Sequence, residues 1–241
     1  MNIYIITGAS KGIGKALAEQ LLETKNNQVV GVSRNCTITH PRYRHQPMDL
    51  SDLAALEHNL QKVFQPYPEA EKLVLVNNAA VLGDIGYIGE QRTENFEFVF
   101  DVNVISPGIL MNTFLSLYAT RSCPKIILNI SSGAGKYPVD GWANYCASKS
   151  ALDMLSLTAQ KEQEIRQTNT RIFSLSPGVV DTAMQEHIRE ADPVRFSSVQ
   201  KFVDYKKNGD LASAEKVAAK IARLLQKPEA VEKVLLSITE I

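Results

Sequence analysis

The stretch that decides the fold is Ile3-Tyr4-Ile5-Ile6, followed at once by Thr7-Gly8-Ala9-Ser10-Lys11-Gly12-Ile13-Gly14. The apolar run Ile3–Ile6 predicts a short buried strand, and a helical pattern, Gly14–Thr24, begins at the last glycine. Glycine adopts positive φ at little steric cost and lets a ligand approach the backbone, so this turn can hold a phosphate at a helix N-terminus. The spacing is GxxxGxG rather than the general GxGxxG fingerprint, but its place between strand and helix indicates a nucleotide-binding turn.

Short apolar runs and longer helical patterns alternate along the rest of the chain. Further strands are predicted at Val29–Ser33, Leu73–Val76, Lys125–Ile130, Arg171–Leu175 and Val234–Ile238, with Arg44–Met48 as a weaker candidate. Further helices are predicted at Asp52–Phe64, Glu94–Tyr118, Asn144–Arg166 and Ala214–Leu225. Most of the strands are apolar without alternation, as expected of parallel strands covered on both faces. The order predicts one α/β domain over residues 1–241, a doubly wound, Rossmann-like parallel sheet with helices on both faces.

The segment Gln185–Leu211 interrupts this alternation with charges, Pro193 and the pair Asn208-Gly209. We expect a helical excursion over the carboxyl ends of the strands, where ligands of such sheets bind. A lid over the ligand and a plain surface insertion are equally good interpretations of this segment.

Composition narrows the functional classes. The chain has 241 residues, of which 44% are hydrophobic, and its 26 basic and 26 acidic side chains give a net charge of zero. A nucleic-acid partner would require a basic face, so none is expected. Cys36, Cys123, Cys146 and four histidines form no metal-ligand pattern, and reduced thiols without a metal are expected. The N-terminus lacks a basic signal-peptide region and no apolar run approaches a membrane span, so we expect a soluble cytoplasmic protein with no membrane partner.

The tip of the second predicted strand indicates which dinucleotide is bound. NAD-binding proteins place Asp or Glu there, whereas this chain has Val32-Ser33-Arg34-Asn35. Arg34 there and Lys11 in the glycine turn fall where the 2′-phosphate of NADP(H) would lie. We therefore expect NADP(H) as cofactor, with a solvated loop arginine as the alternative interpretation of Arg34.

A tyrosine and a lysine four residues apart, Tyr145 and Lys149, lie within a predicted helix and therefore share one face. The Lys149 ammonium is expected to lower the phenol pKa, so that Tyr145 can act as an acid in reduction and a base in oxidation. Lys149 can also hydrogen-bond the nicotinamide ribose. Ser132 follows the strand Lys125–Ile130, where its hydroxyl can donate to the oxygen of a developing alkoxide.

Two further motifs accompany these residues, Asn77-Asn78-Ala79-Ala80 and Pro177-Gly178-Val179-Val180-Asp181-Thr182. Together with the glycine turn, Ser132 and the run Tyr145-Cys146-Ala147-Ser148-Lys149, these two motifs resemble the short-chain dehydrogenase/reductase family across essentially the whole chain. Ala80 stands where that family usually has Gly. The resemblance implies that Ser132 polarises the carbonyl, Tyr145 donates the proton and Lys149 activates it, while Asn103 holds a water of the proton relay. The resemblance also implies contacts to particular parts of the cofactor: Asp49 and Leu50 to the adenine, Asn78 and Ala79 to the adenosine ribose, and Val180 and Thr182 to the nicotinamide carboxamide. The other implied cofactor contacts are Gly8, Ser10, Lys11, Gly12, Ile13, Gly14, Ser33, Arg34, Tyr145, Lys149, Pro177 and Gly178.

The run Gly141-Trp142-Ala143-Asn144-Tyr145-Cys146-Ala147-Ser148-Lys149, with Asp153-Met154 after it, resembles the sepiapterin reductase and bacterial benzil reductase branch. Sepiapterin reductases carry an acidic pterin anchor near the C-terminus, whereas the approximate counterpart here is Ser237, with Glu240 as a possible substitute. Tyr137, Trp142, Val180 and Met184 suggest a bay for a flat, hydrophobic ketone or 1,2-diketone, although Tyr137 and Trp142 suit loop packing nearly as well.

We therefore expect an NADPH-dependent carbonyl reductase acting on a small molecule. The alternatives are a sepiapterin-type pterin reductase, an alcohol dehydrogenase working in oxidation, and a non-catalytic nucleotide-binding regulatory protein. The resemblance also implies a homodimer through the helices Glu94–Tyr118 and Asn144–Arg166, with a tetramer as the other possibility.

Overall fold

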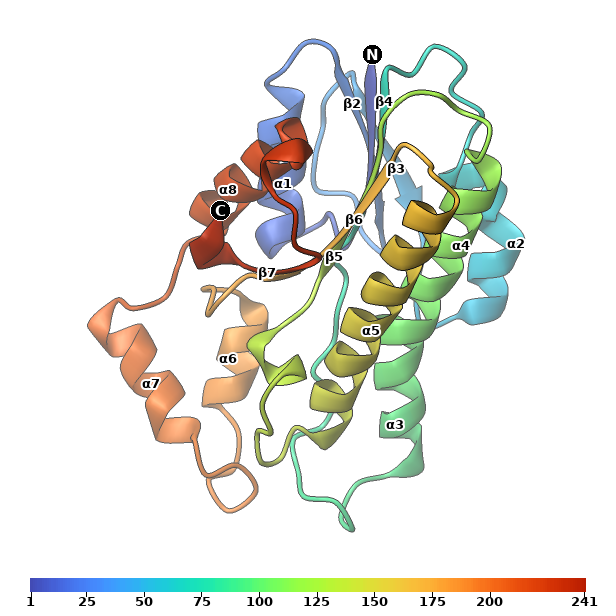
Figure 1. Ribbon diagram of the computed structural model, residues 1–241. Coiled ribbons are helices and arrows are strands. Elements are labelled where there is room, and N and C mark those ends of the chain that lie inside the picture. Colours follow the sequence, from blue (N-terminus) through green and yellow to red (C-terminus); the bar gives the residue numbers. More distant parts are fainter.

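Seven parallel strands form one sheet in the computed structural model, which describes all 241 residues. Their spatial order is β3-β2-β1-β4-β5-β6-β7, and helices cover both faces of the sheet (Figure 1). The strands are β1 (Asn2–Thr7), β2 (Asn27–Ser33), β3 (Tyr43–Pro47), β4 (Lys72–Asn77), β5 (Lys125–Ile130), β6 (Thr170–Ser176) and β7 (Leu235–Ser237). The helices are α1 (Gly12–Leu22), α2 (Leu53–Val63), α3 (Thr93–Phe100), α4 (Ser106–Leu117), α5 (Ala143–Ile165), α6 (Ala183–Arg189), α7 (Val199–Asn208) and α8 (Ala214–Gln226).

Apolar side chains on both faces of the sheet hold these layers together. One core cluster of 26 buried residues joins the sheet to α1 and α8, and a second cluster of 18 joins the opposite face to α2 and α4. Strand β5 has no exposed residue, which explains why its sequence is apolar without alternation. The predicted α/β fold class, a doubly wound parallel sheet, is confirmed.

The direction of winding reverses between β1 and β4, which are neighbours in the sheet although β2 and β3 lie between them in the chain. Such a reversal leaves a crevice at the carboxyl ends of the strands. Thr7, the last residue of β1, closes the base of this crevice, because its Oγ1 accepts hydrogen bonds from the backbone N–H groups of Asn78 and Ala79, each at 3.0 Å. Asn77 joins β4 to β5, because its side-chain Nδ2 donates a 2.8 Å hydrogen bond to Asn129 Oδ1.

The predicted helix Glu94–Tyr118 is interrupted, which the apolar pattern did not reveal. Asp101–Ile105 forms a π-helical segment between α3 and α4. The whole stretch Thr93–Leu117 is also long and apolar enough to span a membrane by length and composition alone, contrary to our expectation of no such run. Its inner side packs against the sheet: Leu110 and Phe114 are fully buried in the second core cluster.

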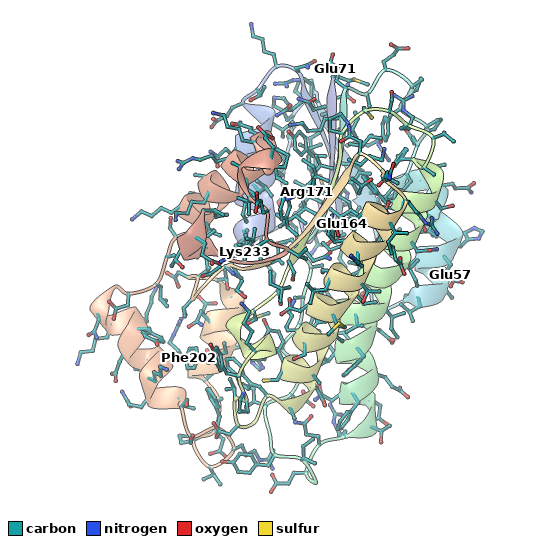
Figure 2. All side chains as sticks on the ribbon, viewed as in Figure 1. Glu57, Glu71, Glu164, Arg171, Phe202 and Lys233 are labelled. Carbon is teal, nitrogen blue, oxygen red and sulfur yellow. The ribbon has the colours of Figure 1, made fainter.

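The segment Gln185–Leu211 forms most of α6, all of α7 and the turns that follow them. Both helices project below the carboxyl edge of the sheet (Figure 1). Figure 2 shows Phe202 on the side of α7 that faces the body of the protein, and its ring lies 5.5 Å from that of Trp142. The predicted helical excursion is therefore present, and it packs on the loop that leads into α5.

Candidate active site

The glycine turn after β1 has a backbone that residues with a side chain rarely adopt. Gly8 and Gly12 have φ angles of 66° and 55°, in the left-handed region. A Cβ on Gly14 would lie 2.4 Å from both the Gly8 carbonyl oxygen and the Asn78 amide nitrogen. The first turn of α1 has no acidic residue and no side-chain cap, so its N–H groups stay available to an anion. These features fit the pyrophosphate of a dinucleotide.

A cavity of about 1010 Å³ extends from this turn along the carboxyl ends of the strands. It brings together residues from β2, β5, β6 and α5 and from the loops that follow β1 and β4. The predicted cofactor residues that line it are Gly8, Ser10, Lys11, Gly12, Ile13, Ser33, Arg34, Asp49, Leu50, Asn78, Ala79, Tyr145, Lys149, Pro177, Gly178, Val180 and Thr182. Gly14 is the one predicted cofactor residue that does not line the cavity, because it packs against Asn78 and Gly8 beneath the cavity floor.

Arg34 lies at the rim of this cavity, at the end of β2. Its guanidinium is 3.9 Å from the carboxylate of Asp49, and both side chains are exposed. The pKa of Asp49 lies below its usual range, mainly because the Ser51 backbone N–H donates to it, with a smaller contribution from Arg34. Arg34 is thus held near the rim by a weak ion pair that a phosphate can replace.

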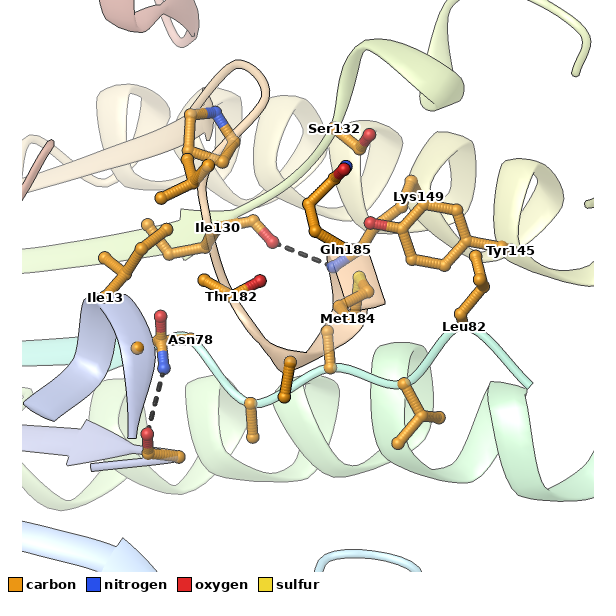
Figure 3. A pocket seen from close by; sticks show the side chains of 18 of the residues that line it. Ile13, Asn78, Leu82, Ile130, Ser132, Tyr145, Lys149, Thr182, Met184 and Gln185 are labelled. Carbon is orange, nitrogen blue, oxygen red and sulfur yellow. Dashed lines mark hydrogen bonds between the residues drawn. The ribbon is translucent and has the colours of Figure 1, made fainter. Parts of the chain in front are cut away.

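Tyr145, Lys149 and Ser132 line one part of the cavity (Figure 3). Tyr145 and Lys149 are only 7% and 1% exposed, and the Lys149 Nζ lies 5.7 Å from the centre of the Tyr145 ring. Nζ donates a 2.9 Å hydrogen bond to the carbonyl oxygen of Ile130, which fixes its position beside β5. Ser132 Oγ accepts from the Ala134 N–H at 3.2 Å, and its hydroxyl can donate toward Tyr145 or toward a ligand in the cavity.

Burial controls the protonation of this pair. It raises the pKa of Tyr145 to about 12, and the hydrogen bond with the Ser132 hydroxyl opposes this only in part. It lowers the pKa of Lys149 to about 8, although the nearby Asp153 carboxylate acts in the opposite direction. We expected Lys149 to lower the pKa of Tyr145, and desolvation instead has the larger effect. The phenol is therefore protonated at neutral pH, as a proton donor must be.

Asn103 lies in the π-helical segment, fully buried and outside the cavity lining. Its Oδ1 accepts from the Val81 N–H at 2.9 Å, and its Nδ2 donates to the Val81 carbonyl and to Ser148 Oγ. Ser148 Oγ in turn donates to the carbonyl oxygen of Tyr145 at 2.8 Å. The Asn103 side chain thus joins the loop after β4 to the first turns of α5. That its amide holds a water stays a prediction.

The substrate end of the cavity has an aromatic wall. Trp142 stacks on Phe196 at 5.1 Å between ring centres and meets the Tyr145 ring edge-on at 5.9 Å. Met184 lines the cavity as predicted. The prediction for Tyr137 is wrong: it is 70% exposed and does not line the cavity. Tyr137 is close in sequence to α5, but the turn that leads into α5 leaves its side chain at the surface.

Several further lining residues were not predicted as site residues. They come from the loop after β4 and from α6 and α7, and they include Leu82, Gln185, Ile188, Lys201, Phe202 and Tyr205. No local motif marks them, since their place depends on how the two short helices fold back over the strand ends. One of these residues, Gln185, is polar and almost completely buried.

The C-terminal region offers no acidic group to the cavity. Ser237 lines it, whereas Glu240 does not. The Glu240 carboxylate accepts from the Ser237 N–H at 2.7 Å and pairs with Lys233 at 3.0 Å. It therefore caps its own helical turn and is not a substitute for an acidic anchor.

The fold and the site define a nicotinamide-dependent oxidoreductase, with a phosphate cradle beside a buried tyrosine–lysine pair. The family model described as short chain dehydrogenase matches residues 2–193, and the chain belongs to that family. Benzil reductase ((S)-benzoin forming) from Bacillus subtilis is 35% identical over 230 residues, which cover 94% of each protein.

Sepiapterin reductase from Mus musculus is 32% identical over 248 residues, covering 93% of this chain and 92% of that protein. Among solved structures, a short chain dehydrogenase/reductase from Saccharomyces cerevisiae shares the fold, with a TM-score of 0.85 at 24% identity over 99% of this chain and 96% of that one. The branch of benzil and sepiapterin reductases is thus the one that the motifs around Trp142 and Tyr145 indicated.

Proposed function

We propose that this protein reduces a hydrophobic ketone or 1,2-diketone with NADPH. The observation that carries the proposal is the convergence of Ser132, Tyr145 and Lys149 in a cavity that apolar and aromatic side chains, among them Trp142 and Met184, also line. The benzil reductase from Bacillus subtilis supports the substrate class, because it matches nearly the whole chain.

The dinucleotide supplies the hydride when it is bound. In the proposed reaction the Ser132 hydroxyl donates to the carbonyl oxygen and the protonated Tyr145 phenol transfers its proton to that oxygen. Lys149, held by the Ile130 carbonyl, stabilises the phenolate that remains and orients the nicotinamide ribose. Asn103 acts as a positioning residue for α5 through Ser148.

NADPH is the proposed reductant because the two cations at the adenosine end of the cavity suit a 2′-phosphate. Arg34 and Lys11 both line it, and no acidic residue occupies the tip of β2. Asp49 follows β3 and pairs with Arg34 rather than replacing it. A charge-assisted hydrogen bond to phosphate contributes about 1.5–3 kcal/mol, enough for a clear preference over NADH.

A pterin substrate is the competing proposal, because sepiapterin reductase is also a relative. Its support is weaker, since Ser237 stands where an acidic anchor is expected and Glu240 is paired with Lys233. An unpaired pterin edge would forgo a charge-assisted hydrogen bond of about 1.5–3 kcal/mol.

The test is a substrate panel followed by loss of NADPH absorbance, comparing benzil, simple aldehydes and sepiapterin. We expect benzil to have the highest kcat/KM of the three. Tyr145→Phe should lower kcat by at least about a thousandfold while the Kd for NADPH changes less than about threefold, because the ring that packs on Trp142 is kept. Retained turnover in Tyr145→Phe would contradict the acid role.

We also propose a homodimer that forms through α4 and α5, with a cytoplasmic location. Support comes from large apolar side chains that are exposed in the single chain: Leu117 in α4, Met154, Leu155 and Leu157 in α5, and Ile105 directly before α4. Large apolar side chains that stay exposed on neighbouring helices are a feature of protein–protein interfaces.

A further inference from the structure

Gln185 is a buried polar residue that the reaction proposed above does not use. It belongs to α6, where its backbone N–H donates to the Thr182 carbonyl at 2.9 Å. Its side chain is only 5% exposed, and its Oε1 has no hydrogen-bond partner. Figure 3 shows this side chain extending toward Ser132, beside Tyr145 and Lys149, and all four line the same cavity.

A buried amide without a partner is uncommon in folded proteins, since its loss of water is not compensated. Where such a group lines a ligand cavity, a ligand can supply the missing partner. A carboxamide offers one acceptor and two donors, and a half-turn about its terminal bond exchanges them. It therefore binds an uncharged oxygen, either a carbonyl or a hydroxyl, and carries no charge that would select an ionic substrate.

The position of Gln185 limits which oxygen this can be. Ser132 and Tyr145 supply the two donors for the oxygen of the carbonyl that is reduced, and Gln185 approaches the same end of the cavity from a different element, α6. The loop after β4 and the helices α6 and α7 also contribute apolar side chains to the lining, including Leu82, Met184 and Phe202, beside the polar His187, Lys201 and Tyr205. A substrate that meets Ser132, Tyr145 and Gln185 together thus presents two oxygens close together, and its body can contact the apolar side chains.

Two other unpartnered polar atoms line the cavity, Ser131 Oγ and Trp142 Nε1. The Trp142 ring is held between Phe196 and Tyr145, so its N–H has a fixed direction. Ser131 directly follows β5, and its backbone N–H donates to the Leu175 carbonyl. Gln185 differs from both residues, because its long side chain extends toward Ser132 and Tyr145 (Figure 3).

We propose that Gln185 is a specificity-determining residue that hydrogen-bonds the second oxygen of a vicinal dicarbonyl, the oxygen that is not reduced. This inference rests on the proposed carbonyl reductase function. It explains how one carbonyl of such a substrate is placed against Ser132 and Tyr145 while its neighbour is held away from them. Because α6 begins directly after Thr182, the same short segment contacts both the cofactor site and the substrate.

The test uses two substrates that differ only in the second oxygen, benzil and deoxybenzoin, in which one carbonyl is a methylene. Gln185→Met keeps the length of the side chain and removes its hydrogen-bonding groups. We expect this variant to lower kcat/KM for benzil by about 10- to 100-fold and to change that for deoxybenzoin by less than about twofold. Met184→Leu is the matched control, since it reshapes the adjacent wall without altering hydrogen bonding and should shift both substrates by the same factor.

Stability separates this role from a structural one. Because Oε1 has no partner within the protein, Gln185→Met should unfold at the same temperature as the unsubstituted protein or higher, with an unchanged Kd for NADPH. A lower Tm, or equal losses on both substrates, would overturn the inference while leaving the carbonyl reductase function in place. If the unsubstituted protein reduces neither substrate, the proposed function fails and this inference fails with it.

Discussion

Lys149 and Tyr145 show how burial sets the chemistry of single residues in this site. Both side chains are almost inaccessible, so each favours its uncharged form, with the pKa of the amine near 8 and that of the phenol near 12. The motif that contains them was visible in the sequence, as were the glycine turn and Ser132. The direction of the Tyr145 shift was not, because it depends on how completely α5, β5 and the loop around Trp142 exclude water from the phenol.

The pH dependence of cofactor capture should follow Lys149. Its amine loses its proton as the pH rises through about 8, whereas Tyr145 remains protonated, so kcat/KM for NADPH in the reductive direction should be constant below pH 8 and fall above it. Initial rates between about pH 6 and pH 10 would measure this. Lys149→Arg keeps its charge over that range and should lose the decline, although its rate is lower. A wild-type profile that is flat to the alkaline limit would contradict the assignment.

Arg34 should decide between the two nicotinamide dinucleotides. Replacing it in Arg34→Asp removes one phosphate partner and adds repulsion, so the KM for NADPH should rise about 10- to 100-fold. NADH lacks the 2′-phosphate and serves as the internal control, with a change below about threefold. Steady-state kinetics with both dinucleotides would measure the ratio, and equal changes would show that Arg34 does not contact that phosphate.

At the scale of elements, the parts of the structure that the sequence did not predict are mostly short connections and small helices. Most strands are marked by short apolar runs and the long helices by periodic patterns, and their predicted bounds lie within a few residues of those observed, β3 included. The π-helical segment has no such pattern, yet it turns Asn103 inward to bond Val81 and Ser148. The lining contributed by α6 and α7 depends on tertiary contacts such as those between Ser197 and Asp140, which no local spacing encodes.

Gly14→Ala should damage the turn between β1 and α1. Its new methyl group would lie 2.4 Å from the Gly8 carbonyl oxygen, so the backbone must move. We expect the Tm to fall by several degrees and the Kd for NADPH to rise more than about tenfold. Gly108→Ala is the matched control, because nothing lies within 4 Å of its added carbon. Within α4 that change should raise stability by about 0.5–1 kcal/mol. Equal thermal stability of the two variants would contradict the steric argument.

At the scale of the whole molecule, the parallel sheet brings the loops that follow its strands to one edge, and the site lies where they meet. This much follows from the alternating pattern, because the carboxyl ends of parallel strands lie together. The surface that remains exposed is harder to derive. Composition shows a chain with no net charge, but only the folded structure shows which apolar side chains of α4 and α5 stay exposed.

Met154→Glu should disrupt the proposed dimer. Met154 is 61% exposed in the single chain, so the charge costs little there and a great deal in an apolar interface. Light scattering coupled to size exclusion should give about twice the 26.7 kDa chain mass for the unsubstituted protein and one chain mass for the variant. Val194→Glu, at the 78% exposed Val194 near α7, should remain dimeric. A monomer before any substitution would remove the proposed interface.

The aromatic wall of the cavity has a spectroscopic consequence. Trp142 is the chain's single tryptophan, and it lies against Tyr145, Phe196 and Phe202 at the boundary between α5 and the two short helices. Its emission therefore reports on one place only, with no background from elsewhere in the polypeptide. Selective excitation of this indole would follow ligand entry and any displacement of α7 in real time, without a label.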